Sequence, residues 1–399
     1  MPVSGQAAVR ASVGLSESFD TVEAAAEAAD RAQAGLGSPC DLAVVFASGH
    51  HLGMAKWLLS EVHDRLGPRA LVGCGAGGTV AGGRELEEGP GVAVWGASLP
   101  GVELETMHLT AERDSEGFRL IGLPESLAAS ADGAPAGNES VLALCDPFSF
   151  PAEELLAAVE RSRPQVPVLG GLASASFAGG AVLLQDGEVH TGGAVAIRLE
   201  GAQVLPCVSQ GAGPVGPEMT ITSAEANVIG QLAGRPAMER LGEVIAALPE
   251  DERELAASGV LIGLVIDENR PEYERGDFLV RPIIGADRES GAIAIGEPVR
   301  VGQTVRLHVR DAASADEDLR EALRAQAQAL GSDGAAGALL FTCNGRGSHM
   351  FDLPDHDAAA VEDSLGAPTA GFFCAGEIGP VGGRNFLHGF TATMALFPA

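Results

Sequence analysis

One β-α-β-loop-β pattern occurs three times along this chain, and it constrains the fold more than any other feature. In each copy an apolar strand precedes a helix, a second apolar strand ends at a glycine, a glycine-rich stretch follows, and a last apolar strand closes the unit. The first strands of the three copies are residues 42–46, 141–144 and 338–342. Short apolar runs bounded by Gly, Pro or Asp are typical of buried strands.

The spacing within the copies is nearly constant. Each second strand ends at a turning glycine: Gly73, Gly170 and Gly371. These glycines follow first-strand residues by 27, 26 and 30 positions: Phe46, Leu144 and Phe341. The second glycine of a Gly-Gly pair comes 10, 10 and 12 residues later. Chance similarity among glycine-rich segments is the alternative. A true repeat predicts that the first two strands of each copy are parallel and joined by a helix, and that the hairpin adds an antiparallel strand. The sheets should therefore be mixed and flanked by helices.

The rest of the chain predicts a second domain. Residues 259–311 contain short strands separated by Gly and Pro, as in an antiparallel meander. A Gly/Pro-rich joint at 210–217 precedes two expected helices, 224–232 and 236–247. We therefore expect an α/β (α+β) chain of two associated domains, with a boundary near 200–220. The expected segments are a leading segment and helix (1–35), an N-terminal domain (36–210), a helical connector (211–255) and a C-terminal domain (256–399).

The charge balance excludes some partners. The chain has 25 basic and 54 acidic residues, a net charge of −29, and Lys56 is its single lysine. Such a charge repels nucleic acid and anionic membranes, so neither is expected as a partner. No apolar run approaches the ~18 residues of a membrane span, and residues 1–10 lack a signal-peptide core. We expect a soluble cytoplasmic protein whose six widely spaced cysteines stay free thiols.

The sequence contains no complete nucleotide-binding motif. Residues 73–78 satisfy G-x-G-x-x-G, but the following stretch, 79–91, carries four glycines and Pro90, so no helix begins there to hold a pyrophosphate. No Walker A loop and no G-x-S-x-G elbow are present. We expect no cofactor.

The C-terminal quarter contains the candidate ligand site. The segment Cys343-Asn344-Gly345-Arg346-Gly347 directly follows an apolar strand, where α/β proteins place ligand loops. Its glycines allow backbone N–H groups to converge on an anion, and Arg346 can bind a carboxylate through two parallel hydrogen bonds. The alternative is a solvent-exposed turn with an extended Arg.

A second loop carries Glu377 among apolar and glycine residues, next to Cys374. A buried carboxylate needs a partner, and Arg384 or a ligand ammonium could serve. A structural Glu–Arg pair is the alternative. Asn385 is a further candidate, whereas His388 is more typical of a satisfied core histidine.

Two other chemistries remain as hypotheses. Cys343 or Cys374 could act as a nucleophile with His349 or His388 as base, although buried inert cysteine fits better. A metal cluster of five residues is disfavoured because Pro354 breaks the spacing and Asp355 or Asp357 suits a helix N-cap: His349, Asp352, Asp355, His356 and Asp357. No metal is expected. His50 and His51 follow the first strand of the first copy, as Cys343 and Asn344 do in the third, and are candidates for a second pocket wall.

Several strings in the C-terminal half resemble the FIST C-terminal domain: RGDFLVRPIIG (275–285), GQTV (302–305), HVRD (308–311), CNGRG (343–347) and GFFCAGEIGP (371–380). Residues 41–51 resemble the start of the FIST N-terminal domain. The resemblance covers nearly the whole chain. It implies a small-ligand sensory module, proposed to bind compounds such as amino acids, which other family members attach to signalling domains or an F-box.

We expect, from the residues and the resemblance together, a non-enzymatic sensor of an amino acid or similar small zwitterionic metabolite, acting in intracellular signalling with a signalling-protein partner. Opposite charges at Arg346 and Glu377, on loops at one sheet edge, are what an amino acid requires. The rival is a thiol-dependent enzyme that acts on an acyl or amide substrate. A scaffold that binds only protein is the third reading.

Overall fold

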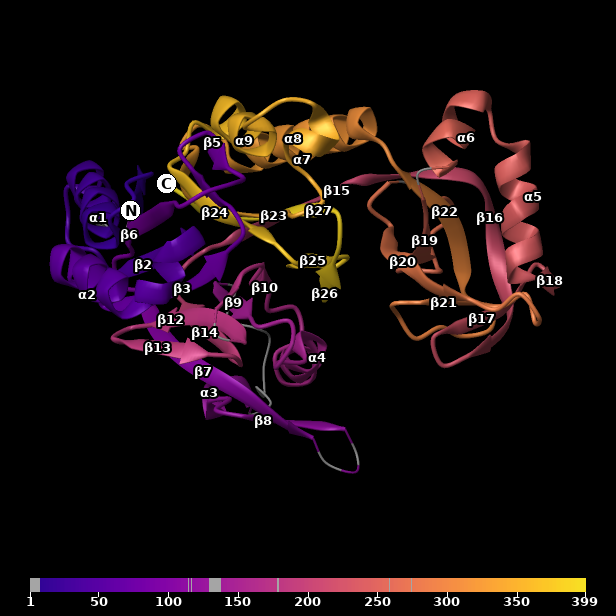
Figure 1. Ribbon diagram of the computed structural model, residues 1–399, viewed down its shortest axis with the longest axis horizontal. Coiled ribbons are helices and arrows are strands. Elements are labelled where there is room, and N and C mark those ends of the chain that lie inside the picture. The colour runs from indigo at the N-terminus through magenta and orange to yellow at the C-terminus, as the bar shows by residue number, and fades with distance from the viewer. Residues whose placement is uncertain are drawn as a thin grey trace, which may run out of the picture. The chain divides into compact units, whose positions relative to one another are not determined.

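The computed structural model describes residues 8–113, 115, 117–128, 138–177, 179–257, 259–273 and 275–399 (Figure 1). The first seven residues of the expected leading segment lie outside this set. Contacts divide the chain into two compact units. Unit 1 is Met1–Val208 together with Leu319–Ala399, and unit 2 is Ser209–Asp318.

Unit 1 contains the three repeats, and each has the order strand, helix, strand, hairpin, strand. The first repeat consists of β2 (Leu42–Ser48), α2 (Ala55–Leu66), β3 (Ala70–Ala76), β4 (Thr79–Ala81), β5 (Arg84–Leu86) and β6 (Val92–Ser98). The second consists of β9 (Glu139–Cys145), α4 (Ala152–Ser162), β10 (Val168–Leu172), β12 (Gly180–Gln185), β13 (Glu188–Thr191) and β14 (Ala194–Glu200), with β11 (Ser176–Phe177) added. The third consists of β23 (Ala335–Cys343), α9 (His356–Leu365), β24 (Thr369–Cys374), β25 (Glu377–Val381), β26 (Arg384–His388) and β27 (Thr391–Pro398).

The pairing registers confirm the repeat. The first two strands of each copy are parallel, and the first and last strands are antiparallel. Phe46, Leu144 and Phe341 occupy equivalent positions, each opposite the residue that follows the turning glycine. At Gly73, Gly170 and Gly371, a Cβ would lie 2.2, 1.9 and 1.8 Å from the carbonyl oxygen of the parallel neighbour. The repeated glycine is therefore required by the close approach of two strands.

The hairpins are exchanged among the repeats, which the sequence did not predict. β4 of the first repeat pairs with β24 of the third, β12 of the second pairs with β3 of the first, and β25 of the third pairs with β10 of the second. An additional strand pairs with the last strand of each repeat: β1 (Arg10–Ser16) with β6, β7 (Glu103–Arg113) with β14, and β15 (Leu205–Gln210) with β27. β8 (Phe118–Ile121) extends the second sheet beyond β7. Three mixed sheets with related strand orders result.

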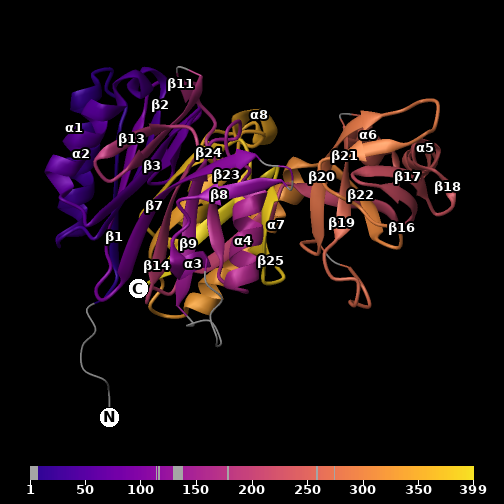
Figure 2. The ribbon, with the colours of Figure 1, turned by 90° about the horizontal axis from the view of Figure 1, so that it is seen from below.

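Apolar residues on one face of all three sheets form a shared core. It includes Phe46, Trp95, Leu144, Phe341 and Phe372. Helices pack on the opposite face of each sheet: α1 (Thr21–Leu36) and α2 on the first, α3 (Glu125–Ala128) and α4 on the second, and α7 (Ala312–Leu330) and α9 on the third. Figures 1 and 2 show these helices outside the strands that they cover.

Unit 2 is an antiparallel sheet that closes on itself. Its strands are β16 (Ala212–Glu225), β17 (Val228–Leu232), β18 (Arg235–Pro236), β19 (Val260–Val265), β20 (Phe278–Ala286), β21 (Ile293–Ile295) and β22 (Thr304–Arg310), joined by α5 (Ala237–Ala247) and α6 (Glu250–Ala257). The order is β16-β22-β19-β20-β21-β17, and β16 also pairs with β17. The meander predicted over 259–311 is present.

Three expectations differ from the structure. Residues 224–232 form the end of β16, the β16–β17 turn and β17 rather than a helix. Ala226 takes a positive φ of 50° in the turn, and Ile229 and Leu232 bury their side chains in unit 2. The expected connector 211–255 contributes three strands to unit 2, so it is not purely helical. The expected segment 256–399 is shared between the units, because the third repeat exchanges hairpins with the other two.

The glycine pair of the second repeat also differs from its counterparts. Gly82-Gly83 and Gly382-Gly383 form hairpin turns with positive φ at both residues. Gly180 instead begins β12, and the hairpin of the second repeat turns at Asp186-Gly187. The hairpin predicted from Asp186-Gly187 is present. The Gly179-Gly180 pair, however, does not form the hairpin turn that the Gly-Gly pairs of the other two copies form.

Candidate functional site

The Cys343–Gly347 turn and the Glu377 loop lie at one edge of the third sheet. β23 and β24 are parallel, with Cys343 opposite Cys374, so the segments that follow them leave the sheet at the same end. Arg346 lies in the turn after β23, and Glu377 begins β25 after a two-residue connection. The strand pairing therefore agrees with the expectation that the Arg346 and Glu377 segments share one sheet edge.

Arg346 is completely buried, and its main partner is a protein carboxylate. Its Nε lies 2.6 Å from Asp357 Oδ2, and its Nη2 lies 2.8 Å from Asp357 Oδ1. The guanidinium also lies over the Phe351 ring, 5.0 Å from its centroid. Asp357 thus makes the two parallel hydrogen bonds with the Arg346 guanidinium that we expected a ligand carboxylate to make. The remaining nitrogen, Nη1, has no hydrogen-bond partner among the described residues.

Asp357, in the first turn of α9, is the counter-ion of this cluster. Thr342 Oγ1 donates to its Oδ2 at 2.6 Å, and His356 Nδ1 lies 2.8 Å from its Oδ1. Burial acts to raise the pKa of Asp357, but the charge of Arg346 and these hydrogen bonds outweigh it. The pKa of Asp357 lies well below its ordinary value, so the buried pair is ionic.

Glu377 is also completely buried, and only one of its oxygens accepts hydrogen bonds from nitrogen or oxygen atoms of the described residues. Its Oε2 accepts hydrogen bonds from Thr391 N at 3.1 Å and from Thr391 Oγ1 at 2.7 Å, and the carboxyl group also contacts the Cys343 thiol. Oε1 has no nitrogen or oxygen partner among the described residues. Burial raises the pKa of Glu377 to about 8, against the opposing effects of Thr391, Cys343 and Arg346. In this state Glu377 carries a proton at neutral pH.

Glu85, on the exchanged hairpin of the first repeat, borders the same cluster. Its Oε1 accepts a hydrogen bond from Ala358 N at 2.9 Å, which caps the start of α9. Burial, followed by repulsion from Asp357, raises the pKa of Glu85 to about 8. One arginine and one aspartate balance each other, and the two glutamates stay neutral. Among the described residues, the cluster therefore presents an unpartnered guanidinium N–H, Arg346 Nη1, and two unpartnered carboxyl oxygens, Glu377 Oε1 and Glu85 Oε2, without net charge.

The predicted Glu377–Arg384 pair does not form. The tight turn of the β25–β26 hairpin places Glu377 opposite His388 and Val381 opposite Arg384, at the two ends of the hairpin. Arg384 is exposed and lies over the Phe386 ring, 5.4 Å from its centroid.

Asn385 and His388 have structural contacts. Asn385 Oδ1 accepts from Val168 N, and its Nδ2 donates to Val166 O, both at 2.9 Å, which ties β26 to the second repeat. His388 Nε2 lies 2.9 Å from Gly379 O inside its own hairpin. The sequence reading of His388 as a satisfied core histidine fits this contact.

The remaining polar candidates lie in two places. Asn344 is exposed, and its N donates to Cys374 O at 2.8 Å, beside the candidate cluster. His50 is exposed and stacks on Phe19, with ring centroids 5.7 Å apart. His51 is buried, with Nδ1 2.9 Å from Thr21 Oγ1. Both histidines therefore contact the start of α1, in the first repeat.

Neither candidate thiol is activated. Burial, followed by the nearby Glu377, raises the pKa of Cys343 to about 12. Cys374 is completely buried, and the same two causes raise its pKa well above its ordinary value. Of the two bases considered, His349 is exposed and His388 bonds to a backbone carbonyl. A thiolate nucleophile is disfavoured at both positions.

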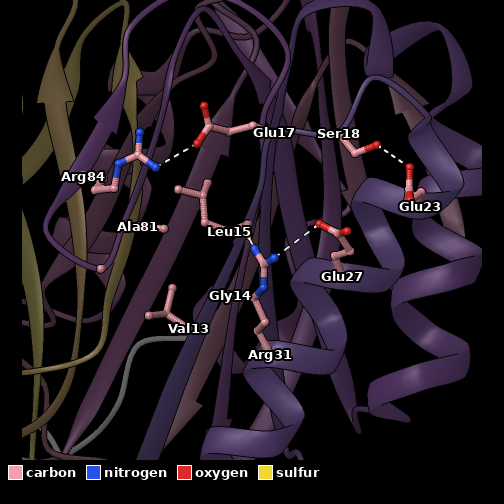
Figure 3. Close-up of a pocket in the computed structure, with 11 residues that line it drawn as sticks. Val13, Gly14, Leu15, Glu17, Ser18, Glu23, Glu27, Arg31, Ala81 and Arg84 are labelled. Carbon is pink, nitrogen blue, oxygen red and sulfur yellow. Dashed lines mark hydrogen bonds and ion pairs between the residues drawn. The ribbon is translucent and has the colours of Figure 1, made fainter.

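An open groove of about 660 Å³ lies elsewhere in unit 1, between β1, α1 and the β4–β5 turn (Figure 3). Its carboxylates all have partners: Glu17 pairs with Arg84 at 2.8 Å, Glu27 with Arg31 at 3.4 Å, and Glu23 accepts from Ser18 Oγ at 2.7 Å. We call it the acidic groove. The sequence analysis missed it because its walls come from segments about fifty residues apart. The buried cluster is the stronger ligand candidate, because three of its buried polar atoms lack partners among the described residues.

The described residues offer neither a metal site of clustered side chains nor a membrane-spanning helix. They contain no group of three or more His, Cys, Asp or Glu side chains placed to hold a metal ion. Within the same residues, no helix is both long enough and apolar enough to cross a membrane.

Comparison with known proteins identifies the family. The FIST N domain matches residues 41–235, and the FIST C domain matches residues 237–380. An uncharacterised protein of Mycobacterium tuberculosis (strain H37Rv) is 46% identical over 394 residues, covering 98% of this chain and 100% of the relative. An uncharacterised protein of Mycobacterium bovis is 44% identical over 393 residues, covering 98% of this chain and 99% of the relative. FIST domains are sensory domains of signal transduction, and this chain, matched along most of its length by both FIST N and FIST C, belongs to the FIST family.

Proposed function

We propose that this protein is a small-ligand sensor whose ligand binds between Arg346 and Glu377, at the end of β23 and β24. The observation that carries the proposal is that Arg346 Nη1 and Glu377 Oε1, both on completely buried side chains, have no hydrogen-bond partner among the residues that the structure describes. A buried polar group without a partner costs roughly 1–3 kcal/mol, and more when it is charged. A ligand that supplies both partners recovers that cost when it binds.

The chemistry of the two atoms favours an amino acid or a similar small zwitterion. A carboxylate oxygen can accept from Arg346 Nη1, and an ammonium group can pair with Glu377 once its proton has left. Because Asp357 holds the other two guanidinium nitrogens, the ligand carboxylate makes a single contact with Arg346 rather than the two that the sequence suggested. Access requires movement of the 344–347 turn, in which Asn344 is exposed.

The proposal extends to location and output. We place the protein in the cytoplasm, where a signalling protein responds to the ligand-bound state. Thiol-dependent catalysis at Cys343 or Cys374 is not part of the proposal, because burial raises the pKa values of both thiols.

A ligand screen tests the proposal. Each of the twenty L-amino acids is added to the protein, and its effect on thermal unfolding is followed by tryptophan fluorescence. A ligand at 100 times its Kd adds about 2.7 kcal/mol of stability. Hits are compared with the matching amine and the matching carboxylic acid, which lack one of the two charges. We expect both analogues to bind at least tenfold more weakly.

Two matched variants assign the site. Glu377→Gln keeps the size and neutrality of the protonated side chain but cannot become an anion, so it should abolish amino-acid binding and leave the fold intact. Glu85→Gln changes the other buried acid with a raised pKa and should leave binding within a few fold. Equal binding by all three proteins would overturn the proposal. Product formation that Cys343→Ser abolishes would instead support the thiol-dependent enzyme.

A further inference from the structure

The described part of the chain exposes four large apolar side chains at the starts of α1 and α2. Phe19 is 78% exposed, Val22 38%, Met54 42% and Trp57 65%. This is unusual in a chain with only 4% aromatic residues, two of which are tryptophans. We call these four residues the α1–α2 patch. Exposed apolar side chains scattered singly need no explanation, whereas a cluster marks an interaction site.

The two helices run side by side in the same direction, which brings their starts together. At their starts, Thr21 Oγ1 lies 2.9 Å from His51 Nδ1, in the 3₁₀ turn that leads into α2 (Gly49–Met54). Towards their ends, Arg65 of α2 pairs with Asp30 of α1. Residues 19 and 22, at the start of α1, therefore lie at the same end of the helix pair as residues 54 and 57, at the start of α2. Figures 1 and 2 both show α1 and α2 adjacent on the outside of the first sheet.

The acidic groove adjoins this patch. Glu17, Ser18 and Glu23 line the groove and are chain neighbours of Phe19 and Val22. Figure 3 shows Glu17, Glu23 and Glu27 along it, with Arg31 and Arg84 paired to two of them. Residues 17–23 thus contribute to both the patch and the groove, and Glu23 is the groove carboxylate whose hydrogen bond comes from a serine rather than an arginine.

We propose that the α1–α2 patch and the acidic groove together bind a basic amphipathic segment of another protein. The apolar side of such a segment covers Phe19, Val22, Met54 and Trp57, and its Lys or Arg side chains meet the groove carboxylates. A second copy of this chain is a poor occupant, because each copy carries a net charge of −29 and the copies repel each other. The same charge accelerates association with a basic partner.

This surface is independent of the proposed ligand site. It belongs to the first repeat and its leading helix, whereas Arg346 and Glu377 belong to the third repeat. Failure of either proposal therefore leaves the other intact, since Glu377→Gln does not alter the patch.

Two synthetic 18-residue amphipathic helices serve as probes, one with Leu and Lys and one with Leu and Glu. Trp57 is a built-in reporter because the other tryptophan, Trp95, is fully buried with Nε1 bonded to Pro368 O at 3.0 Å. We expect the Leu/Lys peptide to shift the Trp57 emission to shorter wavelength and to protect it from acrylamide. The Leu/Glu peptide should do neither.

Variants then locate the binding surface, with peptide affinity measured by fluorescence anisotropy. Val22→Ser/Met54→Ser should weaken the Leu/Lys peptide at least tenfold. Phe148→Ser, which removes an 86% exposed side chain from the second repeat, should leave the affinity within twofold. Glu23→Gln should weaken binding severalfold, whereas Glu250→Gln on α6 should not.

Three results would overturn the proposal. The first is equal affinity of both peptides. The second is an equal loss in Phe148→Ser and Val22→Ser/Met54→Ser. The third is a dimer in sedimentation that Val22→Ser/Met54→Ser converts to a monomer, which would make a second copy the occupant.

Discussion

Replacement of Arg346 by methionine tests the electrostatic account of the cluster. Methionine has a similar length and no charge, so the main change is the loss of the two hydrogen bonds, 2.6 and 2.8 Å long, that Arg346 makes to Asp357. Asp357 stays buried, with Thr342 and His356 as its remaining partners. Breaking a buried pair on one side typically costs about 3–5 kcal/mol, because a charge is left uncompensated. Typical total stabilities are about 5–15 kcal/mol, so Arg346→Met should fold but be clearly weakened.

The double variant Arg346→Met/Asp357→Asn separates charge from packing. Asparagine keeps a polar side chain near Thr342 and His356 but carries no charge, so the double variant should be about 2 kcal/mol more stable than Arg346→Met alone. Arg84→Met provides the control. Arg84 and Glu17 are 2.8 Å apart but are both about half exposed, and such a pair contributes roughly 0–1 kcal/mol.

Urea unfolding followed by tryptophan fluorescence measures these differences. Trp57 and Trp95 both lie in unit 1, so the signal follows the unit that contains the cluster. The reasoning is refuted if Arg346→Met costs no more than Arg84→Met, or if the double variant is less stable than Arg346→Met. Either result would mean that Asp357 is not held as a buried anion.

Three further predictions concern titration, backbone contact and thiol reactivity. Between about pH 5 and 8 Glu377 keeps its proton when folded and loses it when unfolded, so stability falls as pH rises. Glu377→Gln should remove about 1.4 kcal/mol per pH unit of that fall in urea titrations. Gly371→Ala should largely abolish folding, by circular dichroism, because its Cβ would lie 1.8 Å from a carbonyl oxygen, whereas Gly389→Ala has open space and should fold normally. Cys343 and Cys374 should react with Ellman's reagent only slowly until urea unfolds unit 1; fast native labelling of either would contradict their raised pKa values.

The local structure of this chain was predictable because its signals are local. Asp20 precedes Glu23 by three residues, a typical spacing at a helix start, and it caps α1: its Oδ1 accepts from Val22 N and Glu23 N, both at 2.9 Å. The turning glycines mark the ends of second strands because a side chain there would collide with the neighbouring strand. Periodicity and turn residues carry this information within about ten residues.

The exchange of hairpins was not predictable from such signals. β4 pairs with β24, which lies about 290 residues further along the chain, and no feature of the β4 sequence indicates that this strand is its partner. The same long-range pairing places the third repeat in unit 1, which the segment boundaries drawn from the sequence did not anticipate.

The candidate site was predicted in part, for similar reasons. Arg346 and Glu377 were placed at one edge by the rule for parallel strands. Asp357 was considered for a metal or an N-cap and not as the partner of Arg346, although it begins the helix that follows the turn. Glu85 was missed because it arrives from another repeat. The Arg384 partner was wrong because the tight turn at Gly382-Gly383 already places residues 377 and 384 at opposite ends of the hairpin.

The symmetry of the scaffold shows that the buried carboxyl group of Glu377 is not needed to build it. Glu377 lies opposite Gly171, and the equivalent hairpin positions are Thr79, opposite Phe372, and Leu183, opposite Cys74. A hydroxyl and an aliphatic side chain therefore support the same strand exchange that Glu377 supports in the third repeat. Burial of Glu377 with a free oxygen lowers stability in a position where Leu183 shows that an apolar side chain is accepted. Thr79 Oγ1 in the first repeat likewise lacks a partner among the described residues, but in the third repeat the unpartnered carboxyl oxygen lies near the unpartnered Arg346 Nη1. A ligand can satisfy both of these atoms at once, which is what a binding site requires.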